Sequence, residues 1–172
     1  MVSTAPERWP LRIRIITLSD RASRGEYEDR AGPAVRRCAE EILAGLPWDV
    51  SFALEILPDD APRLRAALEA AFAGGADVVF TTGGTGIGPR DLTPDVIRPL
   101  LDKELPGVME AIRVKYGAAI PSALLSRSIA GVAGRTLVYA LPGSARAVEE
   151  YMAEIGRSLH HALLMLAGID AH

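Results

Sequence analysis

Cysteine and aromatic residues are scarce in this chain of 172 residues, and long apolar runs are missing. The single cysteine, Cys38, excludes an internal disulfide and any metal or redox site built on a Cys-x-x-Cys pair. No stretch approaches the roughly 18 uncharged apolar residues of a membrane-spanning helix, so we expect no membrane partner. The net charge is −3 and only 5% of the residues are aromatic, so we also expect no nucleic-acid partner.

The amino terminus carries no pattern of a targeting signal. Residues 1–10 are polar and lack the apolar segment of a signal peptide, so we expect a cytoplasmic protein with a short N-terminal extension. Apolar residues make up 49% of the chain and charged residues 24%, as in ordinary soluble globular proteins. Residues 11–172 show no internal repeat and no linker, and their length predicts one domain.

Hydrophobic periodicity in the first half of the chain predicts alternating strands and helices. Residues 11–18, 50–57 and 77–82 have the apolar, β-branched pattern of strands. An amphipathic helix follows each of the first two, and these helices are expected to end at Pro47 and at Gly74-Gly75. Two successive strand–helix–strand units imply parallel strands with helices packed on them, which is an α/β fold.

The second half of the chain continues this pattern with one difference. We expect Thr93 to cap a helix, a second helix to run from Val108 to Tyr116, and Pro106-Gly107 to separate the two. Two strands joined across Ala133-Gly134 then predict an antiparallel addition to the sheet. A last long helix begins after Ser144.

Polar or glycine-rich segments follow the predicted strands at residues 19–32, 58–60, 83–91 and 142–144. In open α/β sheets, ligands bind outside the carboxyl ends of the strands, so these segments are expected to meet at one site. The strongest signal lies in residues 83–91, where four of the first six residues are glycine. Glycines let backbone N–H groups approach an anionic ligand, and Arg90 can add a bidentate phosphate contact. The alternative is a wide turn that uses glycine to avoid strain.

Asp59 and Asp91 each follow a predicted parallel strand by a few residues. Two carboxylates at a sheet edge, beside a phosphate-binding loop, suit Mg²⁺, which takes a few carboxylates together with substrate phosphates. The alternative for Asp59 is a helix N-cap, a role that Asp60 can also fill, and the alternative for Asp91 is a turn-stabilising residue.

Other polar residues have plainer explanations from the local sequence. Ser19-Asp20-Arg21 fits a solvated loop tip, and Ser144 fits an N-cap, although the N-terminus of the helix behind Ser144 can also bind an anion. Cys38 lies on an apolar helix stripe and fits a small core residue. His160 and His161 are adjacent, so they cannot form an i, i+4 metal pair on a helix.

Residues 81–95, TTGGTGIGPRDLTPD, closely resemble the signature of the MogA/MoaB-type molybdenum cofactor biosynthesis proteins. Residues 18–35, LSDRASRGEYEDRAGPAV, resemble the first loop of that family and favour its MogA branch. The segments LPDD, ELPGVMEAIR and ALLSRSIAGVAGRTLVYALPGS occur in the family's order. The resemblance covers nearly the whole chain, and several motifs in order are far more specific than one glycine-rich loop.

The resemblance implies a three-layer α/β/α domain with a mostly parallel sheet, assembled as a homotrimer. MogA-type members use Mg²⁺ and ATP to adenylylate molybdopterin with release of pyrophosphate. The adenylylated pterin then passes to a molybdenum-insertion protein of the MoeA type.

The resemblance also implies which residues carry the activity. Its two functionally important aspartates fall on Asp59 and Asp91, which are therefore the expected catalytic residues and Mg²⁺ ligands. The implied substrate- and nucleotide-binding residues are Ser19, Asp20, Arg21, Thr82, Gly83, Gly84, Thr85, Gly86, Arg90, Ser126, Arg127, Pro142, Gly143 and Ser144. Residues 86–90 are more similar to MoaB-type members, so the alternative is a MoaB-like protein or a non-catalytic molybdopterin carrier.

Overall fold

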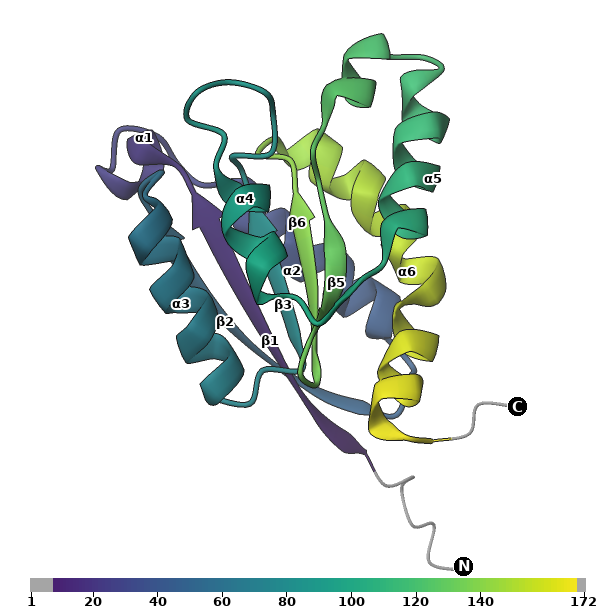
Figure 1. Cartoon of the computed structure of the whole chain (residues 1–172). Coiled ribbons are helices and arrows are strands. Elements are labelled where there is room, and N and C mark those ends of the chain that lie inside the picture. Colours follow the sequence, from purple (N-terminus) through teal and green to yellow (C-terminus); the bar gives the residue numbers. More distant parts are fainter. Residues whose placement is uncertain (1–7, 170–172) are drawn as a thin grey trace, which may run out of the picture.

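Residues 8–169, the part of the chain that the computed structural model describes, form a six-stranded sheet at the centre of the molecule (Figure 1). The strand order is β2-β1-β3-β6-β5-β4. These strands are β1 (Trp9–Leu18), β2 (Trp48–Leu57), β3 (Val78–Thr82), β4 (Lys103–Glu104), β5 (Ala130–Ala133) and β6 (Thr136–Leu141). Strands β2, β1, β3 and β6 are mutually parallel, while β5 pairs antiparallel with β6 and with β4. The expected parallel sheet with an antiparallel addition is confirmed.

Helices cover both faces of the sheet and make three layers (Figure 1). On one face lie α2 (Ala31–Leu43), α5 (Pro106–Gly117) and α6 (Ala145–Ala167), and their apolar residues join those of the sheet in one core cluster. On the other face lie α3 (Ala61–Ala73), α4 (Thr93–Ile97) and the 3₁₀ turn η1 (Arg98–Leu100). The α/β/α fold class is therefore confirmed. Among the described residues, no helix is both long and apolar enough to cross a membrane.

Strand β1 lies at the centre of the parallel half and has the pattern of a strand buried on both faces. Ile13, Ile15 and Ile16 are almost fully buried, and they pack into the two cores on either side of the sheet. Strand β3 is buried along its whole length. Burial on both faces explains why β3 and the second half of β1 are largely apolar, because each face there meets a layer of helices.

Several element boundaries differ from the predictions. Strand β1 begins at Trp9, inside the expected extension 1–10, of which residues 1–7 lie outside the described residues. Helix α2 ends at Leu43, before Pro47. The polar segment after β1 contains a short helix, α1 (Asp20–Ser23). The first two differences involve element ends, where one or two local hydrogen bonds decide the boundary. The third is a single helical turn that the Ser19 side chain caps.

Two predicted roles in the second half were wrong. Thr93 is not the cap of α4 but its first residue, because its hydroxyl donates to the carbonyl of Gly83 at 2.8 Å. Pro106 and Gly107 do not interrupt a helix. They begin α5, where proline in the first turn loses no intrahelical hydrogen bond. The caps expected at Ser144 for α6 and, as the alternative to Asp59, at Asp60 for α3 are both present.

Candidate active site

The carboxyl ends of β1, β2, β3 and β6 lie along one edge of the sheet, and the four polar segments predicted to meet there do so. Two pockets open at this edge, one of about 670 Å³ and one of about 260 Å³. The larger lies between the glycine-rich loop (residues 83–91), the start of α6 and the 3₁₀ turn η2 (Pro121–Leu125). The smaller lies between that loop, Asp59 and the start of α2. Gly84, Asp91 and Gly143 line both pockets, so the two are neighbours.

The glycine-rich loop packs closely against the backbone of neighbouring strand ends. Gly83 has a φ of +93°, and a Cβ placed on it would lie 2.4 Å from the carbonyl oxygen of Leu18. A Cβ on Gly143 would in turn lie 3.2 Å from Gly83 Cα. Position 83 therefore favours glycine for two reasons, because other residues tolerate neither this backbone conformation nor this packing distance well.

Asp91 is held within this loop by the loop's own backbone. Its Oδ2 accepts a hydrogen bond from the Gly88 amide at 2.8 Å. A Cβ added at Gly86 would lie 2.7 Å from the same oxygen, so a side chain there would displace the carboxylate. The loop thus presents Asp91 to both pockets at once.

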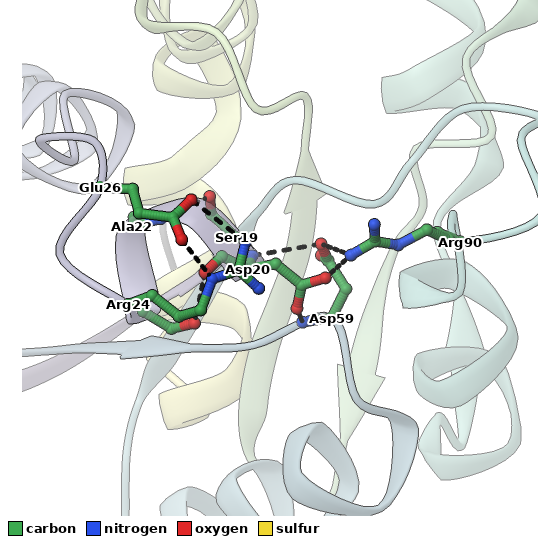
Figure 2. A network of polar contacts seen from close by, with 8 residues as sticks. Ser19, Asp20, Ala22, Arg24, Glu26, Asp59 and Arg90 are labelled. Atoms are coloured by element: carbon green, nitrogen blue, oxygen red, sulfur yellow. Dashed lines mark hydrogen bonds and ion pairs between the residues drawn. The ribbon is translucent and has the colours of Figure 1, made fainter.

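Asp59, Asp20 and Arg90 form a polar cluster (Figure 2), and two of its members, Asp59 and Arg90, line the smaller pocket. The Asp59 amide donates to Asp20 Oδ1 at 2.9 Å, and the Asp20 amide donates back to Asp59 Oδ2 at 3.3 Å. The Arg90 guanidinium forms an ion pair with Asp20 and lies 3.5 Å from Asp59 Oδ2. Because Asp60 caps α3, Asp59 is free to face the pocket.

Burial raises the pKa of Asp59 above its ordinary value, and repulsion from the charge of Asp91 raises that pKa further. Asp59 and Asp91 both line the smaller pocket, so their carboxylates face the same space.

The other predicted site residues fall into three groups. The first group lies in the first loop and consists of Ser19, Asp20 and Arg21. Ser19 caps α1 (Figure 2). The guanidinium carbon of Arg21 lies 5.3 Å from the centre of the Tyr27 ring. The second group lines the smaller pocket and contains Thr82 together with Ser19; Tyr27, which was not predicted, lines this pocket as well. Gly83, Thr85, Gly86, Ser126, Pro142, Gly143 and Ser144 all line the larger pocket.

Arg127 is placed differently from the other predicted binding residues. Its guanidinium donates to the carbonyl of Gly86 at 2.8 Å, to the carbonyl of Asp91, and to both carboxylate oxygens of Asp95. Its own amide donates to the carbonyl of Thr85 at 2.8 Å. Arg127 therefore contacts the glycine-rich loop at three residues, Thr85, Gly86 and Asp91.

Sequence patterns missed several residues of the site. Asp29 accepts hydrogen bonds from the Ala31 and Gly32 amides and from the Thr17 hydroxyl, which joins β1 to the start of α2. An acidic residue three positions before Gly32-Pro33 is the signal that could have identified these hydrogen bonds to the start of α2. Tyr116 and Tyr151 line the larger pocket from α5 and α6, but their helical spacing fits a core position equally well.

Comparison with known proteins gives a consistent result. Residues 14–161 match the family described as "Probable molybdopterin binding domain". The chain is 40% identical to a molybdopterin adenylyltransferase of Pyrococcus furiosus, over 87% of either protein. It is 36% identical to a molybdenum cofactor biosynthesis bifunctional protein of Synechococcus elongatus, over 91% of this chain. The chain spans only about half of that relative, 47% of its length.

A solved structure shares both fold and sequence with this chain. The molybdopterin biosynthesis enzyme MoaB of Thermus thermophilus superposes with a TM-score of 0.80. The two sequences are 42% identical, and the match covers 92% of this chain and 97% of the other.

Proposed function

The chain belongs to the MogA/MoaB-type family of molybdenum cofactor biosynthesis proteins, and we propose that it adenylylates molybdopterin. In this reaction an oxygen of the pterin's terminal phosphate attacks the α-phosphorus of ATP. A new P–O bond forms, the bond between the α-phosphorus and its bridging oxygen breaks, and pyrophosphate leaves. The observation that carries the proposal is the pair of adjoining pockets that share Asp91 and Gly84.

Two adjoining pockets suit a reaction that joins two phosphate compounds. The larger, at about 670 Å³, has the size of an ordinary small-molecule site. With one substrate in each pocket, their phosphates meet at the wall the pockets share. Bringing two anions together in line is the main requirement of phosphoryl-type transfer, because the protein supplies little covalent chemistry.

The residues at the shared wall have properties that favour this chemistry. The glycine-rich loop lets phosphates approach the backbone closely, and α6 directs its N-terminus, capped by Ser144, toward the same wall. Arg90 lies 3.5 Å from Asp59 and suits a phosphate contact once substrate competes with Asp20. We propose Ser19, Asp20, Thr82 and the loop 83–86 as further contacts.

Magnesium is proposed as the ion that accompanies ATP. The described residues contain no group of three or more acidic, histidine or cysteine side chains placed to hold a metal ion. Asp59 and Asp91 instead fit an ion that keeps waters and takes substrate phosphates, and a cation would relieve the repulsion between them. When bound, Mg²⁺ would neutralise charge that develops on the phosphates.

We also propose a cytoplasmic homotrimer that passes its product to a molybdenum-insertion protein of the MoeA type. Support for such a partner comes from the Synechococcus relative, whose name describes one bifunctional protein of molybdenum cofactor biosynthesis. The trimer follows from the family resemblance.

The proposal is tested by incubating the purified chain with molybdopterin and Mg-ATP. We expect one pyrophosphate per pterin adenylylated. The second candidate is a MoaB-like protein or carrier that binds the pterin without turnover, and the 42% identity to the Thermus MoaB favours it. Tight pterin binding without pyrophosphate release would select that candidate.

A further inference from the structure

We infer that Arg127 is a positioning residue that, together with Asp95, fixes the glycine-rich loop and the backbone of Asp91. This inference rests on the proposed function and deepens it, because it separates the residues that touch substrate from those that hold them. It changes the role expected of Arg127, which the sequence grouped with the substrate-binding residues.

The guanidinium of Arg127 has three hydrogen-bond partners, two backbone carbonyls of the loop and the carboxylate of Asp95. Its Nε donates to the Gly86 carbonyl at 2.8 Å, and one terminal nitrogen donates to the Asp91 carbonyl. The other terminal nitrogen, Nη1, donates to both oxygens of Asp95, at 2.9 and 3.0 Å. Gly86 and Asp91 stand at either side of the loop's tip, so one planar group fixes the distance between them.

Within the described residues, neither Arg127 nor Asp95 lines the larger or the smaller pocket. Their carbonyl partners, Gly86 and Asp91, do line the larger one. Arg127 therefore lies behind the loop that faces the substrates. A phosphate contact by Arg127 would require it to abandon bonds to two backbone carbonyls and a carboxylate.

The segment that carries Arg127 is itself anchored. Arg113 on α5 donates to the carbonyls of Ser126 and Ser128, at 3.4 and 3.0 Å. The Tyr151 hydroxyl on α6 donates to Ser126 Oγ at 3.0 Å. These hydrogen bonds tie residues 126–128 to α5 and α6, and Arg127 in turn holds the loop. The loop is therefore held in place relative to two helices.

Asp95 contributes by orienting the guanidinium. The Asp95 carboxylate is 59% exposed, so the ion pair by itself adds little stability. The hydrogen bonds from Arg127 nevertheless hold the pKa of Asp95 below its ordinary value, so it stays ionised near neutral pH. Loss of Asp95 would free the guanidinium to rotate and weaken both carbonyl contacts.

A lysine at position 127 separates geometry from charge. Lysine keeps the positive charge but cannot form the planar fork that reaches three partners. We expect R127K to lower kcat about 10- to 100-fold, because small misplacements of catalytic groups cost that much, while KM for both substrates stays nearly unchanged. R65K is the matched control, since Arg65 makes an exposed ion pair with Glu69 on α3.

The decisive experiment is a double-mutant cycle of R127A, D95A and R127A/D95A, with hydrogen exchange of residues 83–91 measured on the ligand-free proteins. We expect faster loop exchange in each variant and a double variant no worse in kcat than R127A. A phosphate-binding Arg127 would instead give a raised KM in R127A, retained activity in R127K, and unimpaired or tighter substrate binding in D95A.

If hydrogen exchange of residues 83–91 is unchanged in both R127K and D95A, the inference is overturned, whatever the catalytic activity of these variants. R127K and D95A carry this test if R127A fails to fold. Failure of the proposed function is a separate outcome, because it is seen as a wild-type protein that releases no pyrophosphate while its loop exchange still depends on Arg127.

Discussion

Asp59 and Asp60 are neighbouring aspartates with different surroundings. Asp60 caps α3 through the Arg63 amide at 2.9 Å, whereas Asp59 faces the smaller pocket. The sequence motif Leu-Pro-Asp-Asp allowed either residue to be the cap, because both stand just before the helix. The hydrogen bond to Arg63 decides the matter, and only the folded backbone shows which carboxylate reaches that amide.

This division predicts opposite effects for two substitutions. D60A should lower the free energy of unfolding by about 1 kcal/mol, as for other lost N-caps, and leave adenylylation near the wild-type rate. D59N should lower kcat about 100-fold. Urea unfolding and pyrophosphate release measure the two effects. A D59N enzyme with wild-type kcat would remove Asp59 from the proposed chemistry.

The raised pKa of Asp59 gives a pH dependence of definite sign. An acid whose pKa is higher in the folded state than in the unfolded state binds more protons when folded, so its ionisation costs stability as pH rises. The loss of stability accumulates as the pH rises from the ordinary carboxylate pKa, about 4, to the raised pKa of folded Asp59. Above that pKa the loss stays constant.

We therefore expect D59N to melt at a higher temperature than the wild type at pH 7, with a difference that shrinks as pH falls toward 4. Thermal unfolding at matched ionic strength measures this difference. A D59N protein that melts at a lower temperature than the wild type at pH 7, by a deficit that shrinks toward acid pH, would mean that Arg90 stabilises the ionised form of Asp59 more than burial and Asp91 oppose it.

Among the elements, the glycine-rich loop shows where sequence-based prediction succeeds and where it stops. Its glycines predicted either a close approach of the backbone to a ligand or a turn that uses glycine to avoid strain. Gly83 has a positive φ and packs against Leu18 and Gly143, which fits the turn and leaves the ligand contact a prediction. The hydrogen bonds by which Arg127 holds the loop were not predicted, because Arg127 lies 36 residues from Asp91 and no local sequence pattern joins the two. Thr93 has the sequence of an N-cap, yet a tertiary hydrogen bond to Gly83 takes its hydroxyl. Strand β4 has two exposed residues, and only pairing with β5 defines it.

Gly83 provides the test of this packing. G83A should destabilise the protein by about 3 kcal/mol, because both a positive φ and a 2.4 Å contact with Leu18 oppose a side chain. G134A is the control: Gly134 has a φ of +60°, but a Cβ added there would meet no heavy atom within 4 Å. Only backbone strain of about 1 to 2 kcal/mol therefore applies at position 134. Equal losses in urea unfolding would show that the contact with Leu18 relaxes at no cost.

For the whole molecule, the alternation of strands and helices along the chain predicted parallel strands with helices packed on them. The three layers were implied by the family resemblance. The mutual placement of the two pockets was beyond such patterns. The larger pocket depends on η2 and on Tyr116 and Tyr151, which lie in three separate segments. Side chains that meet only in the folded state leave no periodic signal.

Assembly is tested at this scale as well. We expect light scattering after size exclusion to give three times the chain mass of 18.3 kDa. A monomer mass, unchanged by concentration, would contradict the proposed homotrimer while leaving the site proposal intact.

The transfer of label from ATP to the pterin is the most direct test of the proposed activity. In a single turnover with excess enzyme, molybdopterin and Mg-ATP labelled at the α-phosphate, the label should appear in the pterin as pyrophosphate is released. The same experiment with D91N should slow this transfer about 100-fold. Label that stays in ATP, while the wild-type protein binds the pterin tightly, would contradict the proposal and leave a binding protein instead.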